Sequence, residues 1–147
     1  MKHVFPLALA VVLVSGCTLF PGASAPPPEY GIRFKAMRDM PSPNFEPRPR
    51  GVAIDMLIIH YTGMENAVAA LAHMRDPEAR VSAHFVIDED GTIYRLVAES
   101  KRAWHAGSAS WGGETNINDR SIGIELVNPG TEFGYRHFPE PQMLALE

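Results

Sequence analysis

The spacing of apolar and polar residues predicts a folded domain that begins near residue 42. Residues 56–61, MLIIHY, form a continuous apolar run of strand length, which predicts a central strand buried on both faces. Residues 121–127 alternate with the two-residue period of a strand. Two more strand-like runs, residues 84–87 and 92–97, are separated by Asp-Glu-Asp-Gly, and this pattern predicts a β-hairpin with Gly91 at positive φ.

Two segments carry signals of helices. Residues 66–74 place Val68, Leu71 and Ala72 at helical spacing, which predicts a short amphipathic helix. A second helix is predicted from Pro139 onward, where proline and an acidic residue precede strong helix formers. Residues 101–119 are rich in Gly, Ser and Asn and predict a long loop, a kind of segment that often carries function.

The N-terminus has the pattern of an export signal. A positively charged start is followed by an apolar run over residues 4–14, which is shorter than the roughly 20 residues that span a bilayer. The run ends in Leu-Val-Ser-Gly-Cys, which resembles the lipobox of bacterial lipoproteins, so residues 1–16 are predicted to be a signal peptide and Cys17 a lipidation site. An ordinary secretory signal with an incidental cysteine is the alternative.

Residues 17–41 are predicted to be a proline-rich tether. Eight of the 13 prolines fall between Pro21 and Pro49, and this composition favours an extended polyproline chain without the hydrogen-bonded ladders of a β-sheet. Acyl chains on Cys17 would hold the protein at a membrane. Because Thr18 rather than Asp follows the cysteine, we expect a lipid-anchored protein of the cell envelope that faces the periplasm, at the outer membrane.

Composition narrows the choice of partners. Hydrophobic residues make up 46% and charged residues 20% of the 147, which is typical of a globular protein. The formal net charge is −4 and no basic stripe is present, so we expect no nucleic-acid partner. The single cysteine excludes an intrachain disulfide and a cysteine-rich zinc site. We expect a monomer.

Glu125 is the first candidate for chemistry. The two-residue period puts Ser121, Gly123 and Glu125 on one face of their strand, and a glycine there could leave room for a substrate beside the carboxylate. A carboxylate near a metal could take a proton from bound water and return it to a leaving amine, which is amide hydrolysis. Simple solvent exposure of Glu125 is the alternative.

Each histidine that could bind a metal or line a cleft could instead have a purely structural role. His60 ends the apolar strand, where sheets with parallel strands tend to present ligand groups, but a histidine taken alone is more often a hydrogen-bonded structural residue than a ligand. The same two interpretations hold for His84 at a strand start and for His105 in the long loop. His73 and His137 are expected to be surface or packing residues. Zinc would suit His60, yet one histidine cannot hold it.

Four segments in order resemble the type 2 N-acetylmuramoyl-L-alanine amidases. They are Leu-Ile-Ile-His-Tyr-Thr, Val-Ser-Ala-His-Phe, Arg-Ala-Trp-His-Ala-Gly and Ser-Ile-Gly-Ile-Glu-Leu, at residues 57–62, 81–85, 102–107 and 121–126. The resemblance covers about residues 44–147, so the domain is taken as residues 42–147. It implies an α/β fold shared with peptidoglycan recognition proteins, in which helices flank a mixed sheet and a groove holds one zinc ion.

The resemblance also implies roles for single residues. His60 corresponds to a zinc ligand and Glu125 to the catalytic base, while His84, Trp104 and His105 border the groove and would contact glycan or stem peptide. The family takes its other zinc ligands from a segment after the last helix, and nothing here matches that segment. We therefore expect a domain that is incomplete at its C-terminus, with the remaining ligands beyond Glu147, in either a truncated record or a naturally short product.

The expected function is zinc-dependent hydrolysis of the amide between N-acetylmuramic acid and L-alanine in peptidoglycan or muropeptides. The alternative is a non-catalytic envelope lipoprotein that binds peptidoglycan through the same groove. A third possibility is a structural envelope lipoprotein that keeps the fold as a scaffold.

Overall fold

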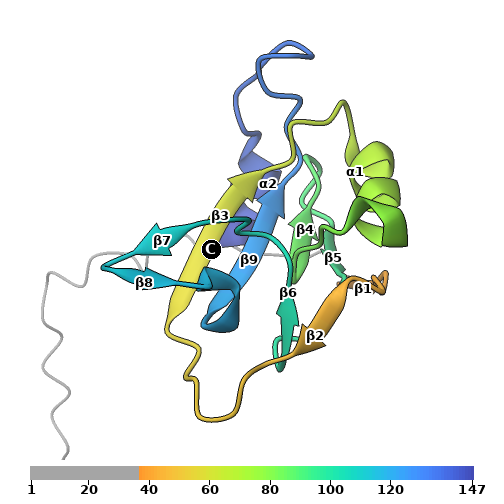
Figure 1. Ribbon diagram of the computed structural model, residues 1–147. Helices are drawn as coiled ribbons and strands as arrows, with labels where there is room; N and C mark the ends of the chain where they lie inside the picture. The colour runs from red at the N-terminus through yellow and green to blue at the C-terminus, as the bar shows by residue number, and fades with distance from the viewer. Residues whose placement is uncertain (1–36) are drawn as a thin grey trace, which may run out of the picture. The chain divides into compact units, whose positions relative to one another are not determined.

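The computed structural model describes residues 37–147 (Figure 1). The predicted signal peptide, most of the predicted tether and Cys17 lie outside these residues. None of the helices within residues 37–147 combines the length and the apolar character needed to cross a membrane. The elements are, in chain order, β1 (Arg38–Asp39), β2 (Phe45–Pro47), β3 (Met56–Tyr61), α1 (Ala67–Arg75), β4 (Phe85–Ile87), β5 (Ile93–Arg95), β6 (Lys101–Ala103), β7 (Ser110–Trp111), β8 (Glu114–Thr115), β9 (Ser121–Leu126) and α2 (Glu140–Leu146).

The central sheet is mixed and has the strand order β1-β5-β4-β9-β3. β9 pairs in parallel with both β3 and β4, β4 pairs antiparallel with β5, and β1 pairs in parallel with β5. Figure 1 shows α2 behind this sheet, on the side away from the segment that joins β6 to β7. The predicted fold class, a mixed α/β sheet with helices against it, is confirmed.

β3 is an edge strand, so the prediction of a central strand buried on both faces is wrong. Within residues 37–147 it pairs with β9 alone, and the side chains of Leu57 and Ile59 are 58% and 50% exposed. The apolar run shows that both faces of β3 avoid charge, but it carries no information about whether a neighbouring layer covers them. α2 contacts the β4 region instead, where Gln142 donates to the carbonyls of Ile87 and Val127 at 2.9 and 3.0 Å.

Helix α1 forms where it was predicted, with a different buried face. Asn66 caps it by accepting a hydrogen bond from Ala69 N at 3.0 Å. The buried positions follow the i, i+3, i+4, i+7 pattern, whereas Val68, which was expected on the apolar face, is 77% exposed. Those buried positions are Ala67, Ala70, Leu71 and Met74.

The predicted hairpin is confirmed as β4 and β5. Gly91 has φ +83°, a conformation that favours glycine. A Cβ at this position would also lie 2.6 Å from the carbonyl oxygen of Pro141, at the start of α2. The turn therefore needs glycine both for its backbone conformation and for its close contact with the second helix.

Residues 101–119 are more structured than the loop that was predicted. They contain β6, the β7–β8 hairpin and a 3₁₀ turn at Ile117–Asp119, and β6 pairs antiparallel with β2. Strands of two or three residues are too short to show a period in the sequence. Similarly, β1 lies within the stretch predicted as tether and adds a short edge strand to the sheet.

The main core lies between α1 and the sheet. Its buried members are Ala67, Leu71, Met74, Ala83, Val86, Leu96, Val97, Ala103 and Val127. The lead-in segment holds the end of α1 in place, because Ser42 Oγ donates to the carbonyl of Met74 at 2.6 Å and Asn44 Nδ2 donates to that of Asp76 at 2.9 Å. These bonds satisfy backbone groups that a helix end leaves without intrahelical partners.

Candidate active site

The register of β3 and β9 brings the two principal candidates together. The parallel pairing sets His60 opposite Glu125 and Ile58 opposite Gly123. Because paired residues of neighbouring strands project from the same side of a sheet, His60, Gly123 and Glu125 share one face. The sequence interpretation that Gly123 and Glu125 lie on a common face agrees with this register.

The space at Gly123 is filled by a histidine. A Cβ built on Gly123 would lie 2.3 Å from Cγ and 2.6 Å from Nδ1 of His105. The expectation that this glycine leaves room for a substrate is therefore wrong, because the loop folds back and the imidazole of His105 rests on the glycine. The sequence could not reveal this contact, since the two residues come from separate segments.

His105 is held at both ring nitrogens. Its Nδ1 lies 3.1 Å from Nε2 of His60, and its Nε2 lies 3.1 Å from Oγ of Ser121. Burial, with smaller contributions from His60 and His84, lowers the pKa of His105 to about 3. Burial also lowers the pKa of His60. Both rings are therefore neutral at physiological pH, the form in which histidine binds metals.

Glu125 is the other group with a strongly shifted pKa. Burial raises the pKa of its carboxyl to about 7, because the charged form is poorly solvated inside the protein. Its Oε2 is buried and has no hydrogen-bond partner within residues 37–147. A carboxyl group with a pKa near neutrality can both take and return a proton at physiological pH, as general acid–base catalysis requires.

His84 is an internal residue. Its side chain has 0% exposure, and the backbone N–H of Gly123 donates to its Nδ1 at 2.9 Å. Nδ1 is therefore the bare nitrogen and Nε2 carries the proton, which it donates to the carbonyl of Lys101 at 3.1 Å. This arrangement favours the structural alternative for His84, which ties β4 to β9 beneath the site, over direct contact with glycan or peptide.

A hollow of about 200 Å³ opens beside Glu125 and His105. Trp104 also lines it, and the guanidinium of Arg80 lies 5.8 Å from the centre of the Trp104 ring. Two of the three predicted substrate contacts, Trp104 and His105, thus border this hollow. The full lining is Thr62, Met64, His73, Met74, Val81, Ser82, Trp104, His105 and Glu125.

His73 was missed as a lining residue. The sequence analysis placed it on the surface of the first helix, and in the structure it is exposed on the last turn of α1, at the wall of the hollow. The place of His73 at this wall depends on how α1 packs against the ends of the strands, and the sequence pattern of the helix does not show this packing. His137 is exposed and is not part of this lining.

Arg48 was also missed, and it organises the base of the site. Its guanidinium donates to the carbonyls of Asn118, Asp119 and Ser121 at 2.9, 2.9 and 2.7 Å, and its Nε donates to that of Glu99 at 3.0 Å. Arg48 Nη2 also lies 3.0 Å from His84 Nε2. Since that nitrogen already carries a proton, this last contact is a close approach and not a hydrogen bond.

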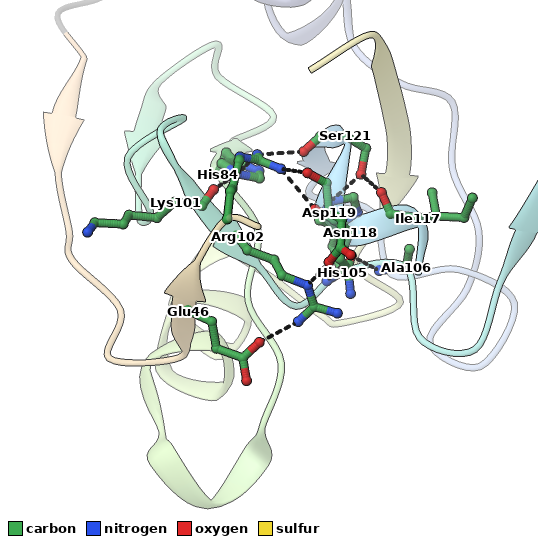
Figure 2. A network of polar contacts seen from close by, with 11 residues as sticks. Glu46, His84, Lys101, Arg102, His105, Ala106, Ile117, Asn118, Asp119 and Ser121 are labelled. Atoms are coloured by element: carbon green, nitrogen blue, oxygen red, sulfur yellow. Dashed lines mark hydrogen bonds and ion pairs between the residues drawn. The ribbon is translucent and has the colours of Figure 1, made fainter. Parts of the chain in front are cut away.

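The loop that carries His105 has its own anchor (Figure 2). The side-chain oxygen of Asn118 accepts the backbone N–H groups of His105 and Ala106 at 3.2 and 2.9 Å. Arg102, at the start of this loop, pairs with Asp119 at 2.5 Å and with Glu46 at 2.8 Å. The position of His105 over β9 is therefore fixed by backbone contacts as well as by its ring.

The donor set fits part of a zinc site. A neutral imidazole and an unpartnered carboxyl group on neighbouring strands are the types of group that a hydrolytic zinc centre uses. Residues 37–147 bring together no group of three His, Cys, Asp or Glu side chains that could hold a metal ion. Within this part of the chain, His60 is the candidate ligand that pairs with Glu125 across the two strands.

Comparisons with known proteins agree with the fold and with these motifs. Residues 50–147 match the family model described as N-acetylmuramoyl-L-alanine amidase. The chain is 34% identical over 137 residues to the N-acetylmuramoyl-L-alanine amidase AmiD of Escherichia coli, a match that covers 88% of this chain and 45% of that protein. The chain thus spans about half the length of this relative.

Solved structures show the same similarity. The crystal structure of an AmpD selenomethionine derivative superposes with a TM-score of 0.65 at 34% identity, covering 75% of this chain and 69% of that one. The complex of AmiD from E. coli with the substrate anhydro-N-acetylmuramic acid-L-Ala-D-gamma-Glu-L-Lys superposes with a TM-score of 0.56 at 34% identity, covering 67% and 43%.

Proposed function

The chain belongs to the N-acetylmuramoyl-L-alanine amidase family, and from this we propose that the protein hydrolyses the amide between N-acetylmuramic acid and L-alanine. The observation that carries the proposal is the juxtaposition of His60 with Glu125, a buried and unpartnered carboxyl group with a pKa of about 7. This pair lies beside a hollow that can accept part of a substrate.

Glu125 performs the proton transfers in the proposed reaction. As a carboxylate it takes a proton from the attacking water, whose oxygen bonds to the amide carbon. It then gives this proton to the leaving nitrogen as the C–N bond breaks, which yields a carboxylic acid and a free amino group. A group with a pKa near 7 is suited to both steps, because neither protonation state is strongly disfavoured at neutral pH.

We propose that the reaction depends on one zinc ion and that His60 is one of its ligands. When bound, zinc lowers the pKa of water toward 7 and stabilises the negative charge that develops on the amide oxygen. The other ligands would come from outside residues 37–147, because these residues contain no further ligand set. His105 would hold His60 through its ring nitrogen and would not itself approach the substrate amide.

The proposed substrate class is peptidoglycan or its muropeptide fragments. The relative AmiD was solved with a substrate that joins anhydro-N-acetylmuramic acid to a short peptide, and we extend this chemistry to the present chain by similarity. Trp104 offers an apolar ring at the wall of the hollow, on which a sugar or a peptide side chain can pack. We also propose a monomer that is anchored through Cys17 in the outer membrane and faces the periplasm.

A non-catalytic peptidoglycan-binding protein is the second candidate. The observation in its favour is that residues 37–147 bring together no group of three side chains that could hold a metal ion. Such a protein would use the same hollow and the same Trp104 wall. It would bind muropeptides without cleaving them, and a chelator would not change its affinity.

One assay separates the two functions. The purified full-length gene product, with any segment that supplies the remaining zinc ligands, is incubated with muropeptides and zinc, and the released peptide is measured by chromatography, while binding is measured in parallel by calorimetry. We expect release that a chelator abolishes and that added zinc restores. Binding without release, unchanged by the chelator, would contradict the amidase proposal and support the binding protein.

A further inference from the structure

The hydroxyl of Ser121 sets the direction of a chain of hydrogen bonds that ends at His60. Ser121 Oγ donates to the carbonyl oxygen of Ile117 at 2.8 Å, and a carbonyl oxygen can only accept. The single hydroxyl proton of Ser121 is therefore committed. Toward Nε2 of His105, at 3.1 Å, the hydroxyl oxygen presents a lone pair, so this ring nitrogen must carry a proton (Figure 2).

The proton on His105 then decides the proton on His60. A neutral imidazole has one ring proton, and in His105 this proton lies on Nε2, because Ser121 Oγ presents a lone pair to that nitrogen. Its Nδ1 is bare and faces Nε2 of His60 at 3.1 Å. Two bare nitrogens at this distance would repel each other, and consequently His60 Nε2 carries the proton and donates it.

We propose that Ser121 and His105 are positioning residues that fix the ring proton of His60 on Nε2 and leave its Nδ1 as the lone-pair nitrogen. The sequence analysis assigned His105 to substrate contact and gave Ser121 no role. The structure places both behind His60, in an ordered series from the carbonyl of Ile117 through two side chains to the strand-end histidine.

The surroundings leave the ring of His105 little freedom. Gly123 admits the ring against β9, and any side chain there would displace it. Asn118 accepts the backbone N–H of His105, and Arg48 donates to the carbonyl of Ser121 at 2.7 Å. The two members of the series are therefore held by their backbones, which favours a single arrangement of their hydrogen bonds.

For the proposed function, this ordering means that His60 presents a lone pair to a metal while its other nitrogen stays hydrogen-bonded. A fixed partner on the second nitrogen orients a histidine ligand and increases its basicity. This consequence rests on the proposed amidase function. The position of the proton does not, since it follows from contacts within the chain.

The test is the position of the ring protons in the full 147-residue chain. In ¹⁵N-labelled protein at pH 8, without added metal, two-bond ¹H–¹⁵N correlation spectra distinguish a protonated from a bare imidazole nitrogen. We expect protonated Nε2 and bare Nδ1 on both His60 and His105. A proton on Nδ1 of His60 would overturn the proposal, whether or not the protein hydrolyses muropeptides.

Two substitutions of Ser121 and a control substitution of Ser42 make the test specific. Ser121→Ala removes the acceptor for His105 Nε2, and we expect the ratio of Nε2-protonated to Nδ1-protonated His60 to fall about fivefold, as loss of one hydrogen bond predicts. Ser121→Thr keeps a hydroxyl and should restore the ratio. Ser42→Ala is the matched control, because Ser42 is also buried and donates to a carbonyl, that of Met74, away from the histidines.

Two results from the spectra of the variants would contradict the proposal. An unchanged ratio in Ser121→Ala, or an equal change in Ser42→Ala, would show that Ser121 does not order the proton on His60. If the wild-type protein shows the expected proton positions but does not hydrolyse muropeptides, this result would count against the amidase function and leave the present proposal standing.

Discussion

On one face of β3, His60 lies beside Glu125 and is hydrogen-bonded to His105; on the other face, Leu57 and Ile59 are at least half exposed. Both faces belong to the same six-residue strand, in which successive side chains point to opposite faces. A contact from a distant segment holds the ring of His60 on the site face, whereas Leu57 and Ile59 on the other face are exposed. Changes on the site face should therefore have large effects, and equivalent changes on the open face small ones.

Gly123→Ala should give the largest effect on stability. Its Cβ would lie 2.3 Å from the ring of His105, so the ring or the strand must move, and we expect a loss of about 3 kcal/mol in the free energy of unfolding. Denaturant unfolding monitored by circular dichroism measures this loss. In a His105→Ala background the same change should cost less than about 1 kcal/mol. An equal cost in both backgrounds would show that the contact with His105 is not the cause.

Glu125 should make stability depend on pH. Burial raises its pKa to about 7 in the folded protein, above the 4.5 of an ordinary glutamate. The folded state therefore favours the protonated form, so the contribution of Glu125 is fully present below pH 4.5 and is lost as the pH rises through about 7. We expect the free energy of unfolding to fall by about 2 kcal/mol between pH 5 and pH 8 on this account.

Glu125→Gln separates this contribution from that of other groups. The variant cannot ionise at this position, so its unfolding free energy should lack the fall of about 2 kcal/mol that is assigned to Glu125. Denaturant unfolding of both proteins at a series of pH values gives the difference. Parallel curves for the two proteins would contradict a raised pKa for Glu125.

Leu57→Thr should have the smallest effect. Leu57 is 58% exposed on the open face of β3, and threonine is well suited to a strand. We expect a change within about 0.5 kcal/mol of the wild-type unfolding free energy. A loss of several kcal/mol would show that this face is covered in solution and that the comparison between the two faces does not hold.

The sequence predicted β3, β4, β5, β9, the first helix and the hairpin, because each has an apolar run, a period or a turn residue of its own, whereas β1, β2, β6, β7 and β8 were not predicted. The shared face of Gly123 and Glu125 followed from the two-residue period of β9. The edge position of β3 could not be predicted, since an apolar run is compatible with a covered or an open face. The exposed position of Val68 depended in the same way on which side of α1 meets the sheet.

The candidate site was only partly predictable, for a related reason. His60 and Glu125 stood out because each ends or interrupts an apolar strand. Arg48 did not, because its role comes from four backbone carbonyls that folding brings together from separate segments. The ring of His105 over Gly123 is also a contact between distant segments, and neither the glycine nor the histidine signals it alone.

The most direct test of the central claim is the rate of muropeptide hydrolysis by the Glu125→Gln variant of the full-length gene product. The claim is that the carboxyl group beside His60 transfers the protons of amide cleavage, and glutamine keeps the shape of the side chain but cannot transfer a proton. We expect turnover to fall at least about a hundredfold, while Glu132→Gln, a change of the same chemistry at an exposed loop position, keeps the wild-type rate. Wild-type turnover in Glu125→Gln would contradict the account.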